Sequence, residues 1–191
     1  MTRAGLDRAR VVATAAGLAD RDGAAALTVS AVARELGVRP PSLYSHVAGA
    51  QELRAAVAAL ALTELADRVD RALAGLAGAD ALVALADAHR AYAAEHPGRF
   101  AAAGAAGAGL VDAELLGAGR RHADHLLAVL RGYAVPAGEQ VHAARLVGSL
   151  LRGFIELEGG GAFAGSSPPA EESWVRALEQ LDAVLRTWGS A

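Results

Sequence analysis

Residues 27–47 read LTVSAVARELGVRPPSLYSHV, and this stretch decides the fold of the N-terminal part of the chain. Thr28 is a good N-cap because its hydroxyl can accept a hydrogen bond from a free backbone amide of the helix that follows. The apolar spacing predicts a short helix from about Val29 to Leu36, which Gly37 ends. Prolines suit the first turn of a helix, so a second short helix is predicted from about Pro41 to His46.

A longer helix precedes this pair, from about Leu6 to Asp22, and Gly23 stands just past its end. Two short helices joined by a tight turn after a longer supporting helix have the layout of a helix-turn-helix. In that motif the second short helix enters the major groove of DNA. Leu43 is the expected apolar anchor of that helix, with polar residues around it.

The same stretch and the helix before it resemble the DNA-binding domain of TetR repressors over about residues 9–55. The resemblance is carried by Ala15, Ala16, Gly23, Thr28, Ala33, Leu36, Gly37, Val38, Leu43, Tyr44 and His46. The chain departs from the family pattern at Ala50, where a lysine is common, and at Val47, where a phenylalanine is common. The lysine would add a phosphate contact, so its absence lowers affinity for DNA without altering specificity.

The expected DNA-binding residues are Thr28, Arg39, Pro41, Ser42, Tyr44, Ser45 and His46. Arg39 and Ser42 begin the second short helix and are the candidates for contacts with base edges, although a solvated or phosphate-bound Arg39 is equally compatible with the sequence. The resemblance implies phosphate contacts for Tyr44 and His46. The alternatives are a buried Tyr44 ring and a His46 that only caps its helix.

The whole chain has the composition of an all-α protein. It has 191 residues, 53% hydrophobic but only 4% aromatic, so Ala, Leu and Val dominate. Further helices are predicted at about 50–76, 81–95, 112–134, 138–158 and 170–188, with no conformation predicted for the low-complexity segment 101–109. We expect a DNA-binding domain at 1–50 and an effector-binding and dimerisation domain at 51–191.

Composition also limits the cellular location that we expect for the protein and the partners that it can bind. The chain has no cysteine, which excludes disulfides and thiolate metal sites, and no segment resembles a signal peptide or a membrane span. We therefore expect a cytoplasmic protein without cofactor. Residues 1–54 hold seven Arg against five Asp and Glu, while the whole chain has a net charge of -3. That small local excess of positive charge is weak support for DNA binding by itself.

Two helices near the C-terminus are expected to form a homodimer interface. Stripes of apolar residues at spacings of three and four run along each helix, as in a helix–helix seam. The stripes consist of Leu146, Leu150, Phe154 and Leu157 in one helix and Trp174, Leu178, Leu181, Leu185 and Trp188 in the other. The TetR resemblance implies that both subunits contribute these two helices to a four-helix interface. Intramolecular packing of the stripes is the alternative.

Polar and aromatic residues among the apolar positions of the middle helices mark the expected effector site. They are His89, Tyr92, Phe100, His122, His125 and Phe154. His122 and His125 lie three residues apart on one helix face, but this spacing alone is weak evidence for a metal. The surrounding apolar residues favour an apolar or aromatic effector.

The sequence therefore predicts a TetR-type repressor that binds a palindromic operator as a dimer and is released by a small effector. An enzyme is disfavoured because the chain has no cysteine nucleophile, no G-x-S-x-G motif and no phosphate-binding glycine loop. A helical ligand-binding or scaffolding protein without DNA binding is the remaining alternative.

Overall fold

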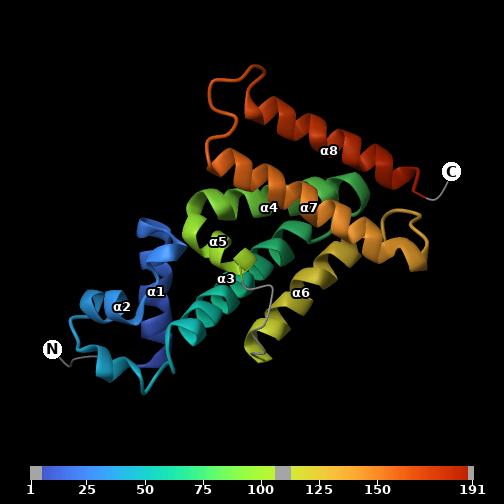
Figure 1. Ribbon diagram of the computed structural model, residues 1–191. Coiled ribbons are helices and arrows are strands. Elements are labelled where there is room, and N and C mark those ends of the chain that lie inside the picture. Colours follow the sequence, from blue (N-terminus) through green and yellow to red (C-terminus); the bar gives the residue numbers. More distant parts are fainter. Residues whose placement is uncertain (1–5, 106–112, 189–191) are drawn as a thin grey trace. The chain divides into compact units, whose positions relative to one another are not determined.

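A computed structural model describes residues 6–105 and 113–188 of the chain, and every regular element within these ranges is helical. Figure 1 shows the arrangement. The α-helices are α1 (Arg8–Asp22), α2 (Val29–Glu35), α3 (Ala50–Leu73), α4 (Gly78–Glu95), α5 (Pro97–Ala105), α6 (Ala113–Leu130), α7 (Gln140–Gly159) and α8 (Ala170–Arg186). Short 3-10 turns lie at η1 (Ala24–Ala26), η2 (Pro40–Leu43) and η3 (Ala137–Glu139). The predicted all-α class is confirmed.

The chain divides into two compact units. The first unit contains residues 1–64 and 95–119, and the second contains residues 65–94 and 120–191. Helices α3 and α6 each contribute residues to both units. This division does not test the predicted domain boundary at residue 50, which stays a prediction.

Helix α1 forms where the sequence predicts it, with a start two residues later. The Asp7 carboxylate accepts a hydrogen bond from the Arg10 amide at 2.7 Å, so Asp7 is the N-cap. Gly23 follows the last residue with a φ of 86°, a left-handed value that glycine adopts without strain. The buried face of α1 packs in the core of the first unit, which also includes Leu27, Leu43, Leu53 and Val57.

Helix α5 is the main departure from the predicted elements. The sequence at 96–98 indicates a break, and α4 does end there. Pro97 nevertheless starts a new helix, because the first turn of a helix does not need the amide hydrogen that proline lacks. The backbone of Gly98 packs directly against the backbone at the end of α1. A Cβ at this position would be 1.9 Å from the Ala19 carbonyl oxygen. The rest of the low-complexity segment, 106–109, lies outside the described residues.

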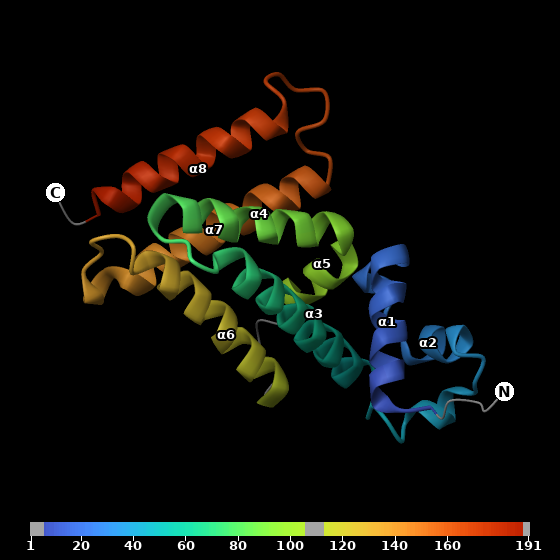
Figure 2. The same cartoon turned by 180° about the vertical axis from the view of Figure 1, so that it is seen from behind.

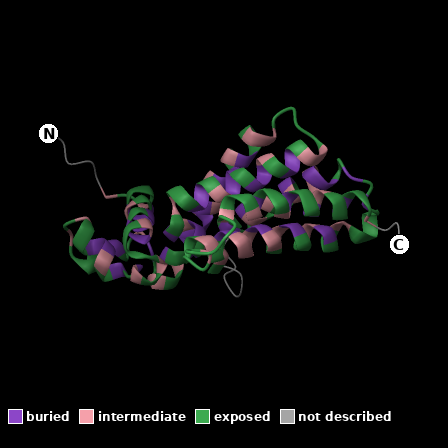
Figure 3. Ribbon diagram, turned by 90° about the horizontal axis from the view of Figure 1, so that it is seen from above, coloured by how far each residue is buried: buried purple, intermediate pink, exposed green. Residues whose placement is uncertain are grey.

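The second unit is built around the apolar stripes of α4, α7 and α8. In Figures 1 and 2, α8 lies above α7 and runs antiparallel to it. In Figure 3, buried and exposed residues alternate along the helical ribbons, as expected of helices that bury one face. α4 begins at Gly78, earlier than the predicted start near 81, so Asp80 lies in its first turn, where a carboxylate interacts favourably with the helix dipole.

Candidate DNA-binding and effector sites

The turn between α2 and η2 has the hydrogen bonds of a Schellman motif. The Gly37 amide donates to the Arg34 carbonyl at 3.1 Å, and the Val38 amide donates to the Ala33 carbonyl at 2.9 Å. Gly37 has a φ of 66°, which allows the chain to reverse immediately after α2. At the other end of α2, the Thr28 hydroxyl accepts from the Ala31 amide at 3.1 Å, so the predicted N-cap is confirmed.

The predicted second short helix is a 3-10 turn followed by a hydrogen-bonded bend. Pro40 and Pro41 have no amide hydrogen, so the first bond of η2 is donated by Ser42 to the Arg39 carbonyl at 2.9 Å. Bonds from His46 and Val47 to the Leu43 carbonyl, at 2.9 and 3.0 Å, complete the structure. The position of the element is therefore as predicted, but its helix type is not.

Side chains on η2 and the bend separate into an anchor and an exposed surface. Leu43 is fully buried, which confirms its anchoring role, while Tyr44 is 57% exposed, so the alternative of a buried ring is wrong. The other predicted DNA-binding residues are also accessible: Thr28, Arg39, Pro41, Ser42 and Ser45 are exposed and His46 is half-buried. We call this set the η2 surface.

Polar contacts link α1 to α2 and close the turn at the start of α3. Arg21 on α1 bridges to both carboxylate oxygens of Glu35 at 3.1 Å, and this contact lowers the pKa of Glu35. The side chains are exposed, so the pair adds little stability but restricts the approach of the two helices. At the start of α3, Glu52 accepts from the Ala48 amide at 2.6 Å.

In the second unit, three of the predicted effector residues are histidines that lie on α4 and α6. His89 and His125 are buried, and His122 is half-buried. The rings of His89 and His122 meet edge to face with centroids 5.0 Å apart. Burial lowers the pKa of His89 to about 4, helped by the neighbouring His122, so the ring is neutral at physiological pH. Burial also lowers the pKa of His122.

Asp70 on α3 is a partner that the sequence did not reveal. Its carboxylate lies 2.6 Å from Nε2 of His125 and also pairs with Arg121. The hydrogen bond from His125 is the largest cause of a lowered pKa of Asp70, and the hydrogen bond from Arg121 is the next. The Asp70 carboxyl group is therefore ionised. Arg121 makes a further ion pair with Asp67 at 2.7 Å. No local motif links Asp70 to a histidine 55 positions later.

Not all of the remaining predicted effector residues lie near the histidines. Tyr92 is buried on α4, with the Arg68 guanidinium 5.5 Å from its ring centroid. Phe154 instead packs against Phe163 and Trp174, with both pairs of ring centroids 5.0 Å apart. Phe100 is buried on α5 and belongs to the first unit. Within the described ranges, no three His, Asp or Glu side chains are grouped as a metal ion requires.

The apolar stripe predicted as the α8 half of the dimer seam is covered by its own chain. Four of its members are at most 4% exposed in the single chain: Trp174, Leu178, Leu181 and Leu185. The Trp174 indole also donates to Asp87 on α4 at 2.8 Å. The assignment of these four to the seam is therefore corrected to intramolecular packing, because a partner subunit cannot reach side chains that are already buried.

Other apolar residues of α7 and α8 stay accessible. Leu146 is 39% exposed, and Leu150, Phe154 and Trp188 are half-buried, so these predicted seam residues are still available to a partner. Leu157 at 53% and Val184 at 46% exposure join them, although Val184 was not predicted.

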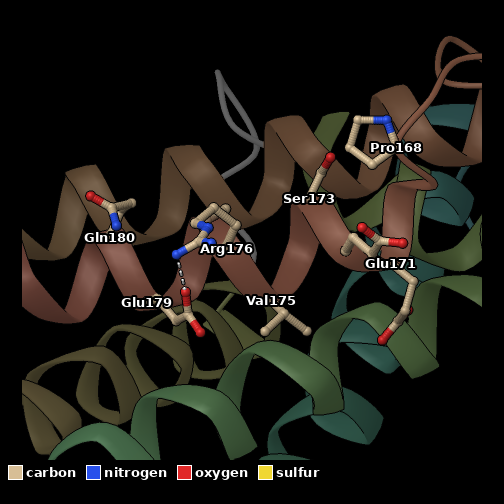
Figure 4. Close-up of a pocket in the computed structure, with 9 residues that line it drawn as sticks. Pro168, Glu171, Ser173, Val175, Arg176, Glu179 and Gln180 are labelled. Carbon is tan, nitrogen blue, oxygen red and sulfur yellow. Dashed lines mark hydrogen bonds and ion pairs between the residues drawn. The ribbon is translucent and has the colours of Figure 1, made fainter.

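Two surface depressions flank α8 in the second unit. One, of about 700 Å³, is lined by Pro168 and by residues of α8, most of them polar, among them Arg176, which donates to Glu179 at 2.9 Å (Figure 4). The other, of about 220 Å³, lies between α4 and α8 and includes Val83, Trp174 and Val175. In the larger depression, polar groups from different helices do not converge on one point. Neither its shape nor its chemistry therefore resembles an enclosed effector site.

Comparison with known proteins identifies the family. The family model described as "Tetracyclin repressor-like, C-terminal domain" matches residues 82–181. The uncharacterized HTH-type transcriptional regulator Rv0681 of Mycobacterium tuberculosis is 37% identical, over 80% of this chain and 70% of its own length. The uncharacterized HTH-type transcriptional regulator YobS of Bacillus subtilis is 33% identical, over 97% and 92%.

A solved structure agrees with this assignment. BioQ of Mycobacterium smegmatis is 28% identical, with a TM-score of 0.72 over 96% of this chain and all of the BioQ chain. None of the described helices combines the length and the apolar character needed to cross a bilayer. The predicted resemblance is confirmed, and the protein is a regulator rather than an enzyme. With a helix-turn-helix at its N-terminus and a matching C-terminal domain, the chain belongs to the TetR family of DNA-binding transcriptional regulators.

Proposed function

We propose that the protein is a repressor that binds a palindromic operator as a homodimer and is released by a small, mainly apolar effector. The observation that carries the proposal is the η2 surface. A fully buried Leu43 fixes η2 to the core of the first unit, while the neighbouring Tyr44 is 57% exposed. The exposed Tyr44 stands among the exposed Arg39, Ser42 and Ser45, and such hydroxyl and guanidinium donors contact phosphates and base edges in protein–DNA complexes.

The η2 surface supplies two kinds of DNA contact in this proposal. Tyr44, His46 and the Thr28 hydroxyl contact phosphates, since a hydroxyl that accepts the Ala31 amide hydrogen can still donate its own. Arg39 and Ser42 contact base edges. A bidentate arginine–guanine pair contributes about 1–3 kcal/mol of discrimination between base pairs.

The proposed dimer interface uses one flank of α7 and one of α8. Leu146, Leu150 and Leu157 are four and seven residues apart, so they project from the same side of α7. Val184 on α8 and Trp188, which lies two residues beyond the end of α8 at Arg186, would extend this flank. A twofold dimer would present two η2 surfaces to half-sites about 34 Å apart, one turn of DNA.

The effector in this proposal binds near His89, Tyr92, His122 and His125. His125 pairs with Asp70 on α3, and α3 also supplies Leu53 and Val57 to the core behind the η2 surface. A change at Asp70 therefore acts on the helix that supports the DNA-binding part. Coupling of this kind is about 1–3 kcal/mol and is reciprocal, so DNA must weaken effector binding equally.

A gel-shift titration with the DNA upstream of the gene, at two salt concentrations, tests DNA binding. Tyr44→Ala should weaken binding to operator and unrelated DNA alike, whereas Arg39→Ala should reduce the preference at one base pair. Arg176→Ala is the matched control, because Arg176 is an exposed arginine of α8 with only a surface partner. Unchanged binding in the Tyr44 variant would contradict the proposed surface.

Sedimentation tests the dimer. Leu157→Glu combined with Leu146→Glu places two charges on the proposed flank of α7 and should give monomers. Val83→Glu is the control, since Val83 is 42% exposed and lies on α4, which is not one of the two helices of the proposed interface. A dimer that persists in the double variant, or a monomer in the control, would show that the interface lies elsewhere.

A further inference from the structure

The smaller of the two depressions beside α8 is a groove between α4 and α8. It has a volume of about 220 Å³ and is lined by residues of both helices, all of them in the second unit. Asp87, which lines the groove, and His89, which does not, are two residues apart on α4. Residues at this spacing project to nearly opposite sides of a helix, so the groove is separate from the proposed effector site.

The walls of the groove are apolar and partly open to solvent. Leu82 and Val83 line it from α4, and Val175 and Leu178 line it from α8. The two leucines are buried, whereas Val83 is 42% exposed and Val175 is 49% exposed. A ligand that covers the two valines would remove apolar surface from water, which favours binding. The groove therefore suits a ligand with an apolar body.

Every described residue that lines the groove and carries a charge is acidic. The four carboxylates belong to Asp87, Glu171, Glu179 and Asp182. The last three pair with arginines, which are Arg90, Arg176 and Arg186 in that order. Arg90 also pairs with Glu158 on α7, so five carboxylates share three guanidinium groups and the groove keeps a net negative charge. A cleft lined by charges of one sign and walled by apolar groups concentrates counter-ions, which here are cations.

Asp87 is the carboxylate that these arginines leave without an ion pair. Its Oδ1 atom accepts a hydrogen bond from the Trp174 indole at 2.8 Å, but the indole is a neutral donor. In the described part of the chain, no cationic side chain pairs with Asp87. Asp87 is also exposed, so a charged group of a ligand can reach it from solvent. An ammonium group in the groove would supply the ion pair that Asp87 lacks.

We propose that the groove binds a small organic cation, with its ammonium group beside Asp87 and its apolar body against Val83 and Val175. The volume is below the roughly 300–1,000 Å³ of sites for drug-sized ligands, so a single ring with a short chain is the expected size. The carboxylates would repel an anion, and a metal ion would leave the valines uncovered. The inference is independent of the proposed repressor function, because none of these residues belongs to the η2 surface or to the proposed dimer flank.

Three probes with the same apolar body test the charge of the ligand. Phenethylamine is a cation near neutral pH, phenethyl alcohol is uncharged, and hydrocinnamate is an anion. In titrations followed by proton–nitrogen NMR, we expect the amine to bind about threefold to fivefold more tightly than the alcohol, as for an exposed ion pair. High salt should reduce this difference. Equal binding of the amine and the alcohol, tighter binding of hydrocinnamate, or no saturable binding of the amine would overturn the inference.

The Trp174 indole reports whether the amine binds in the groove. Its N–H group donates to Asp87, and the chain has one other tryptophan, Trp188, so Trp188→Phe assigns the signal. We expect phenethylamine to shift the Trp174 indole signal to a plateau. A signal that does not move while the amine binds would place the cation elsewhere and would overturn the inference.

Variants assign the preference to the groove. Asp87→Asn removes the charge but keeps an oxygen that can accept from the indole, and it should abolish the preference for the amine. Asp124→Asn is the matched control, because Asp124 is exposed on α6 and does not line the groove. Val175→Lys, at an exposed position, places an ammonium group of the protein at the groove and should also abolish the preference. Circular dichroism establishes that each variant is folded. A preference that survives in folded Asp87→Asn or Val175→Lys protein, or that is lost in Asp124→Asn, would overturn the inference.

A second copy of the chain is the competing occupant of the groove. Sedimentation with and without phenethylamine distinguishes the two, because the proposed dimer flank leaves the groove free. The amine should therefore bind without changing the oligomeric state. An amine that dissociates a dimer would show that a partner subunit covers the groove and would overturn the inference.

Discussion

Replacement of Gly98 by alanine tests the packing of α5 against α1. A Cβ at this position would lie 1.9 Å from the oxygen and 2.1 Å from the carbon of the Ala19 carbonyl, and 2.6 Å from the Asp20 nitrogen. All three atoms are backbone, so no side chain can rotate away to make room. One of the two helices must move instead.

The expected cost follows from what such a movement breaks. Overpacking of a tight contact costs about 1–3 kcal/mol, and the clash with backbone places Gly98 at the upper end. Moving α5 also strains the hydrogen bond from the Arg99 amide to Asp20, which measures 2.9 Å and is worth about 1 kcal/mol. The better helix propensity of alanine returns up to about 1 kcal/mol. We expect a net loss of about 2–3 kcal/mol in the free energy of unfolding.

Urea unfolding followed by circular dichroism measures this loss, and Gly17→Ala is the matched control. Gly17 lies inside α1, also in the first unit, and a Cβ there meets no atom within 4 Å. The control should therefore gain about 0.5–1 kcal/mol from helix propensity. The two glycines should respond with opposite signs. A Gly98→Ala protein as stable as wild type would refute the close contact between α1 and α5.

Three further changes have defined outcomes. Gly37→Ala should lower the free energy of unfolding in urea by about 1 kcal/mol, because alanine is strained at a φ of 66°. An unchanged midpoint would contradict the left-handed conformation of this residue. Thr28→Ala should also cost about 1 kcal/mol through loss of the N-cap, with Thr28→Ser retaining most of it. His89 titrates near 6.5 when unfolded and at about 4 when folded. The unfolded state therefore binds more protons between these values, so stability falls by roughly 3 kcal/mol as the pH falls from about 6.5 to 4 and is independent of His89 above 6.5. His89→Asn should flatten that part of the profile, and an equally steep acid loss in the variant would assign it to other groups.

The local parts of the helix-turn-helix could be predicted because each depends on a few neighbouring residues. Thr28 caps α2 within four residues, and Gly37 ends it through the conformation of one residue. Leu43 is buried because it is the apolar residue of a short polar turn. The helix type of η2 was missed, because 3-10 turns are frequent as short connectors and the apolar pattern of so few residues does not distinguish them from one α-helical turn.

Contacts between distant residues could not be predicted in the same way. The stripe on α8 correctly indicates a buried face, but periodicity does not say whether the covering surface comes from the same chain or from a partner. The position of α5 depends on Gly98 meeting the end of α1, which is a property of the packed fold rather than of the Gly-rich segment. The pairing of His125 with Asp70 likewise arises only when α3 and α6 pack.

The buried stripe also changes which experiment can test dimerisation. Removal of α8 would take Trp174 and Leu185 out of the core, and with Trp174 the hydrogen bond to Asp87. Loss of one fully buried large side chain already costs about 3–5 kcal/mol, a large share of the stability of a typical domain. Monomers or aggregates of a truncated protein would therefore reflect unfolding of the second unit. Only substitutions on exposed positions such as Leu157 can report on the interface itself, because they leave this core intact.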